Sequence, residues 1–182
     1  MGADIHLFLE YLESEELSGW TALADGPLSV GRDYLLFEAI AGVRSVRGYQ
    51  PKYPPRGIPK KASLAVLERL LYRVAGKDED LSNTIWRPVS RKQATQWVTG
   101  GHSELYKGSD FFSDLDGTYV RDPNFTSVGW LFRQEVIDSI SAAGLDITRA
   151  PKEVEVLLSI MHVLEQQYGE RCARMVFWFD SE

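Results

Sequence analysis

Asp4 and His6, near the start of the chain, are the first residues that could do chemistry together. They lie two residues apart in a segment that alternates apolar and polar residues, so both side chains belong to the same face of a predicted strand. A carboxylate beside an imidazole can orient a general base or share a metal ion. The alternative is a histidine on a solvated strand face with no chemical role.

A second histidine, His102, follows Gly100-Gly101 and precedes Ser103. Glycine lets the backbone approach a ligand closely and can deliver the next side chain into a pocket. His102 could then act as the acid to the base at His6, or as a second metal ligand. We take His6 and His102 as candidate catalytic residues and Ser103 as a candidate ligand-binding residue. The alternative for His102 is an exposed turn histidine.

Arg32, Arg44 and Arg56 are the candidate anion-binding residues. A guanidinium group binds phosphate or carboxylate through two parallel hydrogen bonds. Arg32 could instead neutralise Asp33 or Glu38 on a surface, and Arg44 could stabilise the carboxyl end of a helix. The sequence therefore predicts phosphate binding by at least one of the three, in a shared pocket with His6 and His102.

Asp180 lies beside the last apolar segment of the chain. If that segment is a strand next to the first one, its carboxylate approaches Asp4 and His6. The candidate metal ligands are therefore Asp4, His6, His102 and Asp180, and these residue types leave open a divalent metal as cofactor. No pair of cysteines and no His-x-x-x-His spacing supports zinc.

The elements that must position these residues follow from the hydrophobic pattern. Period-two alternation predicts a strand over 4–12 with one face on the core, and 18–23 could return as its hairpin partner. The run of β-forming residues at 175–179 predicts a central strand buried on both faces. Because both terminal strands need a sheet, we expect them to be direct neighbours.

Helical spacing of apolar residues, with glycine or serine at several ends, predicts the helices. They are expected over 32–43, 63–76, 90–98, 130–143 and 151–168. The proline-rich segment 49–59 is expected to be a loop, and 102–129 to be loop and short strand. The fold class is therefore α+β, with a small, mainly antiparallel sheet containing both terminal strands, packed by four or five helices.

Length and composition limit the class of protein. The 182 residues are 44% hydrophobic and 25% charged, which is typical of one globular domain spanning 1–182. The net charge of −6 makes nucleic acid an unlikely partner, and the absence of a long apolar run makes a membrane unlikely. The single cysteine, Cys172, excludes an internal disulfide, and a cytoplasmic location is expected.

Several motifs span nearly the whole chain in a fixed order. They are Met-Gly-Ala-Asp-Ile-His at 1–6, Arg-Asp-Tyr-Leu-Leu-Phe at 32–37, Ala-Gly-Val-Arg at 41–44, Arg-Gly-Ile-Pro at 56–59, His-Ser at 102–103 and Arg-Met-Val-Phe-Trp-Phe-Asp at 174–180. Together they resemble a family of uncharacterised bacteriophage and prophage proteins. This chain departs from the family pattern at Lys60-Lys61, where an acidic residue is expected, and at 104–106. The resemblance implies a phage setting and no particular chemistry.

Two classes of function follow. The first is a phage accessory protein with a polar site for a small anionic ligand, a nucleotide or phosphate ester, which it binds or hydrolyses. The alternative is a non-enzymatic phage protein that binds and inhibits a host protein, such as a defence or nuclease component. An acidic surface rich in aromatic residues would suit that alternative. The sequence leaves open catalysis, the oligomeric state and the host target.

Overall fold

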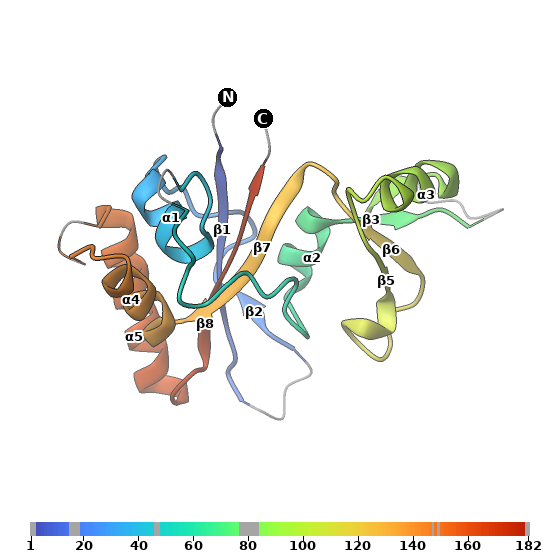
Figure 1. Ribbon diagram of the computed structural model, residues 1–182. Coiled ribbons are helices and arrows are strands. Elements are labelled where there is room, and N and C mark those ends of the chain that lie inside the picture. The colour runs from blue at the N-terminus through green and yellow to red at the C-terminus, as the bar shows by residue number, and fades with distance from the viewer. Residues whose placement is uncertain are drawn as a thin grey trace.

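The computed structural model describes residues 3–14, 19–45, 48–76, 84–146, 148 and 150–180. Within these residues the chain forms two four-stranded sheets and five α-helices, which confirms the predicted α+β class. Figure 1 shows the sheet with both terminal strands at the centre, helices on one side, and the second sheet on the other.

The central sheet, sheet A, has the strand order β2-β1-β8-β7 and is antiparallel throughout. Its strands are β1 (Ile5–Tyr11), β2 (Thr21–Ala22), β7 (Phe125–Phe132) and β8 (Ala173–Asp180). The two terminal strands pair directly along their length, which confirms their predicted adjacency and brings the two ends of the chain side by side (Figure 1). β2 supplies the predicted hairpin return, except that Ser18 lies outside the described residues.

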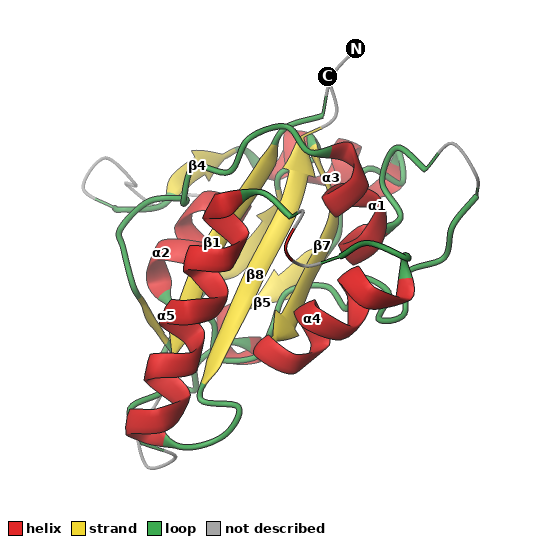
Figure 2. Ribbon diagram, turned by 90° about the vertical axis from the view of Figure 1, so that its left-hand side faces the viewer, coloured by secondary structure: helices red, strands yellow, loops and turns green. Residues whose placement is uncertain are grey.

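Three helices cover one face of sheet A, as Figure 2 shows. They are α1 (Tyr34–Ala41), α4 (Arg133–Ala142) and α5 (Lys152–Tyr168). Alternate residues of β8, including Met175 and Phe177, are buried against them. The predicted end of the first helix is confirmed, since Gly42 ends α1 in the left-handed conformation with φ of 68°. None of the helices in the described part of the chain is long and apolar enough to cross a membrane.

The opposite face of sheet A packs on the rest of the chain. This part contains α2 (Leu64–Leu70), α3 (Arg91–Thr99), a 3₁₀ turn (Gly108–Asp110) and sheet B. Sheet B has the order β4-β3-β6-β5, in which only the β3–β4 pair is parallel. Its strands are β3 (Leu71–Val74), β4 (Arg87–Val89), β5 (Leu105–Lys107) and β6 (Thr118–Arg121).

One hydrophobic cluster joins the two sheets. Phe8 of β1 and Trp178 of β8 belong to it together with Leu71 and Tyr119 of sheet B, all essentially unexposed. β8 is therefore buried on both faces, as its sequence predicted. The sequence predicted that only one face of β1 packs on the core. The other face, which carries Phe8 and Glu10, is buried as well, and Glu10 is 0% exposed.

Two predicted helices have different bounds because strand pairing takes over part of each. The helix expected over 63–76 begins after the Ser63 cap but ends at Leu70, and β3 follows at once to pair with β4 and β6. The helix expected over 130–143 begins only at Arg133, because Trp130–Phe132 pair with β8. In both segments tertiary hydrogen bonding overrides a local helical pattern.

Candidate functional site

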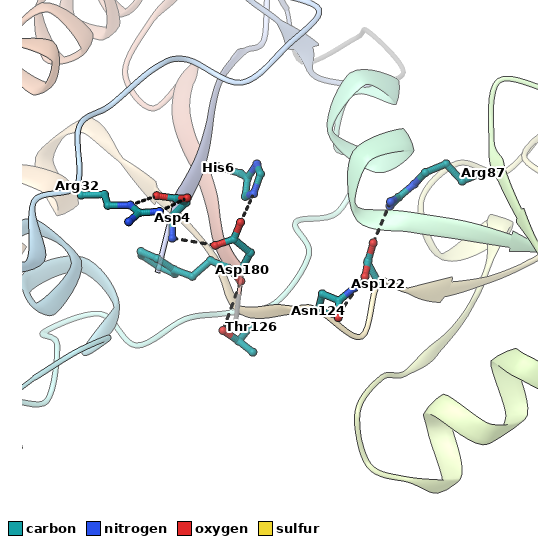
Figure 3. A network of polar contacts seen from close by, with 9 residues as sticks. Asp4, His6, Arg32, Arg87, Asp122, Asn124, Thr126 and Asp180 are labelled. Carbon is teal, nitrogen blue, oxygen red and sulfur yellow. Dashed lines mark hydrogen bonds and ion pairs between the residues drawn. The ribbon is translucent and has the colours of Figure 1, made fainter. Parts of the chain in front are cut away.

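A polar cluster at the ends of β1 and β8 contains Asp4, His6, Arg32 and Asp180 (Figure 3). One oxygen of Asp180 accepts the backbone N–H of Asp4 at 2.8 Å, and the other lies 3.4 Å from Nε2 of His6. Arg32 donates to both carboxylate oxygens of Asp4, with Nη2 at 2.7 Å from Oδ2. Pairing of the terminal strands thus brings Asp180 to Asp4 and His6, as the sequence predicted.

The imidazole of His6 is held among aromatic rings. It stacks on Trp178, with ring centroids 5.6 Å apart and an interplanar angle of 11°, and it lies 5.2 Å from Phe125. Its side chain is 31% exposed. A fixed imidazole beside a carboxylate is the arrangement that a general base requires.

The carboxylate of Asp4 forms an ion pair with Arg32. The hydrogen bond from the Arg32 guanidinium lowers the pKa of the Asp4 carboxyl below its ordinary value. The partner of Arg32 is therefore Asp4, while the neighbouring Asp33 caps α1 by accepting the backbone N–H groups of residues 35 and 36. Arg32 serves here to neutralise a carboxylate of the same cluster.

His102 and Ser103 lie on the loop after α3. His102 is exposed, and its ring lies against Gly100, where an added Cβ would meet Cδ2 at 2.9 Å. Ser103 is buried and donates its hydroxyl to the carbonyl oxygen of Arg121. Among the residues that the structure describes, no hydrogen bond, ion pair or ring contact joins His102 to His6.

The candidate metal ligands lie at the ends of β1 and β8 and on the loop after α3. In the described ranges, no group of three or more His, Cys, Asp or Glu side chains is placed to hold a metal ion. Asp4, His6 and Asp180 share one cluster, in which Arg32 occupies the Asp4 carboxylate. His102 belongs to the α3 loop.

Arg44 and Arg56 are the other two candidate anion-binding residues. Arg44 is exposed just beyond α1, with a left-handed φ of 59°. Arg56 donates to both oxygens of Glu135, at 3.0 and 2.8 Å, and its guanidinium carbon lies 4.7 Å from the centroid of Trp130. Of the predicted anion-binding residues, Arg56 lines a pocket of about 870 Å³.

This pocket, which we call the cationic pocket, opens where sheet A faces the turn that follows β5. Its volume lies in the range of small-molecule sites. It combines cationic groups with aromatic rings and two carboxylates. The lining residues used below are Trp20, Arg56, Lys60, Lys61, Asp110, Phe112, Asp114, Trp130 and Arg174.

A buried ion pair forms the floor of the cationic pocket. Nε of Arg174 donates to Glu10 at 2.7 Å, and the side chains are 4% and 0% exposed. The other oxygen of Glu10 accepts the backbone N–H of Ser63 at 2.6 Å. Burial lowers the pKa of Arg174, while the charge and hydrogen bond of Glu10 oppose that shift. The Arg174 guanidinium is therefore held in place, and the carboxylate of Glu10 balances its charge.

Guanidinium groups and indole rings alternate along one wall. The guanidinium carbon of Arg174 lies 3.9 Å from the ring centroid of Trp20 and 5.9 Å from that of Trp130. Arg56 covers Trp130 as well. Stacking of this kind keeps long side chains in a single arrangement and so favours a preformed site.

The backbone of Lys60 and Lys61 is anchored to the same wall. The carbonyl oxygen of Lys61 accepts the N–H of Trp20 at 3.0 Å, and that of Lys60 accepts both terminal nitrogens of Arg174 at 3.4 Å. Lys61 adopts a left-handed φ of 53°, a conformation that is unfavourable for a side chain of this kind. Within the described part of the chain, no hydrogen bond or ion pair engages either ammonium group. Both remain available to a ligand.

Sequence reasoning missed most of this pocket. Lys60-Lys61 stood out only as a departure from a family pattern, and Trp130 was assigned to a helix. The available signal was the pair of lysines after a proline-rich segment that already contained Arg56.

The resemblance to the phage family stays a prediction. Searches among models of protein families, curated proteins and solved structures found no match to this chain.

Proposed function

We propose that this protein binds a small organic anion of the phosphate-ester class in the cationic pocket. The observation that carries the proposal is the placement of Lys60 and Lys61 on an anchored backbone beside a wall of stacked arginines and indoles. Ammonium groups are common phosphate ligands because each offers three donors and a compact positive charge. A preformed site gains affinity because little ordering is needed on binding.

The charges within the pocket define the kind of anion. Arg56 is already paired with Glu135, and Arg174 with Glu10. The two lysines are then the cations left for a ligand, while Asp110 and Asp114 line the same pocket. This balance favours a ligand with one phosphate over a longer polyphosphate, which would meet the two carboxylates.

The lining of the cationic pocket supports binding of the ligand and does not include the two candidate catalytic histidines. Neither His6 nor His102 is among the residues that line the cationic pocket. The alternative of a phage protein that inhibits a host protein also stays a prediction. It needs no small ligand, so a binding measurement separates the two classes.

The test is a titration of the purified protein with ribose 5-phosphate, followed by calorimetry and by tryptophan fluorescence, since Trp20 and Trp130 line the pocket. The double variant K60A/K61A should bind at least about tenfold more weakly than the wild type. The matched control K92A/K152A removes the same charge from exposed positions outside the pocket and should bind as the wild type does. Equal affinity of all three proteins, or no binding to the wild type, would contradict the proposal.

A further inference from the structure

A second compartment opens beside the cationic pocket. It has a volume of about 440 Å³ and is lined by Gly19, Trp20, Thr21, Leu64, Phe112, Asp114 and Leu115. Trp20, Phe112 and Asp114 line both spaces, so the two are adjacent. We call this second space the side compartment.

The two spaces differ in charge. The cationic pocket is lined by two lysines and two arginines, whereas among the described residues that line the side compartment there is no cation and one carboxylate, Asp114. Its other described lining residues are neutral and include Trp20 and Phe112. A ligand that fills both spaces would therefore carry an anionic end and a neutral end.

The shape of the side compartment depends on Gly19. A Cβ at that position would lie 2.5 Å from Cε1 of Phe112, so the absence of a side chain lets the phenyl ring approach the backbone. The N–H of Trp20 donates to the carbonyl oxygen of Lys61, which fixes the backbone next to Gly19. Trp20 and Phe112 are the aromatic residues that line both spaces.

We propose that the ligand is a nucleoside monophosphate whose base occupies the side compartment and whose phosphate lies at Lys60 and Lys61. This assignment rests on the proposed function and adds the class of ligand. Aromatic side chains stack on nucleobases because every base has a flat π face. Asp114, at the junction, is placed to accept hydrogen bonds from ribose hydroxyls, since a carboxylate is an acceptor only.

The test compares adenosine monophosphate, ribose 5-phosphate and inorganic phosphate by calorimetry. The wild type should bind adenosine monophosphate at least about tenfold more tightly than ribose 5-phosphate, because only the nucleotide carries a base. In the variant Leu64→Trp, a larger side chain fills the compartment from a position that is 47% exposed. This variant should lose the preference for the nucleotide and keep its affinity for ribose 5-phosphate.

Two further variants keep the test decisive. Thr21→Trp blocks the same compartment from an exposed position on β2 and should act as Leu64→Trp does, even if one of the two folds poorly. Leu105→Trp is the matched control, since Leu105 is 51% exposed and lies outside both spaces. It should retain the preference.

The outcomes separate the two proposals. If the wild type binds adenosine monophosphate and ribose 5-phosphate equally, or if the blocked variants keep the preference, the base does not occupy the side compartment and only the phosphate site stands. If none of the three anions binds, the proposed function and this assignment are both wrong.

Discussion

Glu10 and Arg174 face one another across the paired strands β1 and β8 and form an ion pair of 2.7 Å in which both side chains are buried. The pair lies beneath the cationic pocket, and Arg174 also covers the indole of Trp20. This buried polar pair on sheet A therefore links the stability of the fold to the shape of the candidate site.

Removing one partner of this pair should be costly. Glu10→Leu leaves the Arg174 charge buried without its counter-ion, and we expect the free energy of unfolding to fall by about 3–5 kcal/mol. The double variant E10L/R174M removes both charges and should recover most of that loss. Urea unfolding followed by circular dichroism measures both. A single variant as stable as the wild type would show that the pair is not maintained in solution.

The polar cluster at the terminal strands should support the fold and leave ligand binding unchanged. Asp180→Ala removes the acceptor of the Asp4 N–H, and a loss of about 0.5–1.5 kcal/mol is expected. His6→Phe keeps a ring on Trp178 and should cost less. Neither variant should change the dissociation constant for ribose 5-phosphate by more than about twofold, since neither residue lines the cationic pocket. A tenfold loss in His6→Phe would instead make His6 a ligand contact.

Stability at acid pH should depend on Asp138. Hydrogen bonds from Lys52, Gln134 and Tyr53 lower the pKa of its carboxyl from 3.8 to about 2. Because the folded-state pKa is the lower one, this stabilisation is complete above pH 3.8 and is lost as the pH falls through about 2.

The variant Asp138→Asn tests this pH dependence. Its free energy of unfolding should decline less steeply than that of the wild type between pH 4 and pH 2, a window set by the two pKa values of about 3.8 and 2. Urea unfolding at a series of pH values gives the comparison. Asp25→Asn makes the same charge change in an exposed loop and serves as control. If the free energy of unfolding declined equally with falling pH in the wild type and in Asp138→Asn, Asp138 would not be the source of the pH dependence.

Gly108 should be intolerant of any side chain. A Cβ there would lie 2.0 Å from the carbonyl oxygen of Leu115, inside the turn that carries the pocket wall. Because backbone must move, Gly108→Ala should cost about 2 kcal/mol or more and weaken ligand binding as well. Gly26→Ala, where no atom lies within 4 Å, is the matched control and should change stability by at most about 0.5 kcal/mol. Thermal melts of both variants measure the change in stability, and a Gly108→Ala protein as stable as Gly26→Ala would contradict the prediction.

The sequence by itself determined the fold class, the adjacency of the terminal strands and the bodies of most helices. These features follow from local rules. Period-two alternation in β1, the apolar run in β8, and the caps at Ser63 and Gly42 act within a few residues of chain. The approach of Asp180 to His6 also followed, because antiparallel pairing of the first and last strands brings the start of one beside the end of the other.

Only the tertiary structure decided where the helices give way to strands and which cations share a pocket. Leu71–Val74 and Trp130–Phe132 fit a helical pattern, but hydrogen bonds to strands distant in sequence stabilise them as β3 and β7. Trp20, Lys60, Asp114 and Arg174 come from four separate segments, and no periodicity links them. They line one pocket because sheet A and the turn after β5 meet there, a contact set by packing between elements.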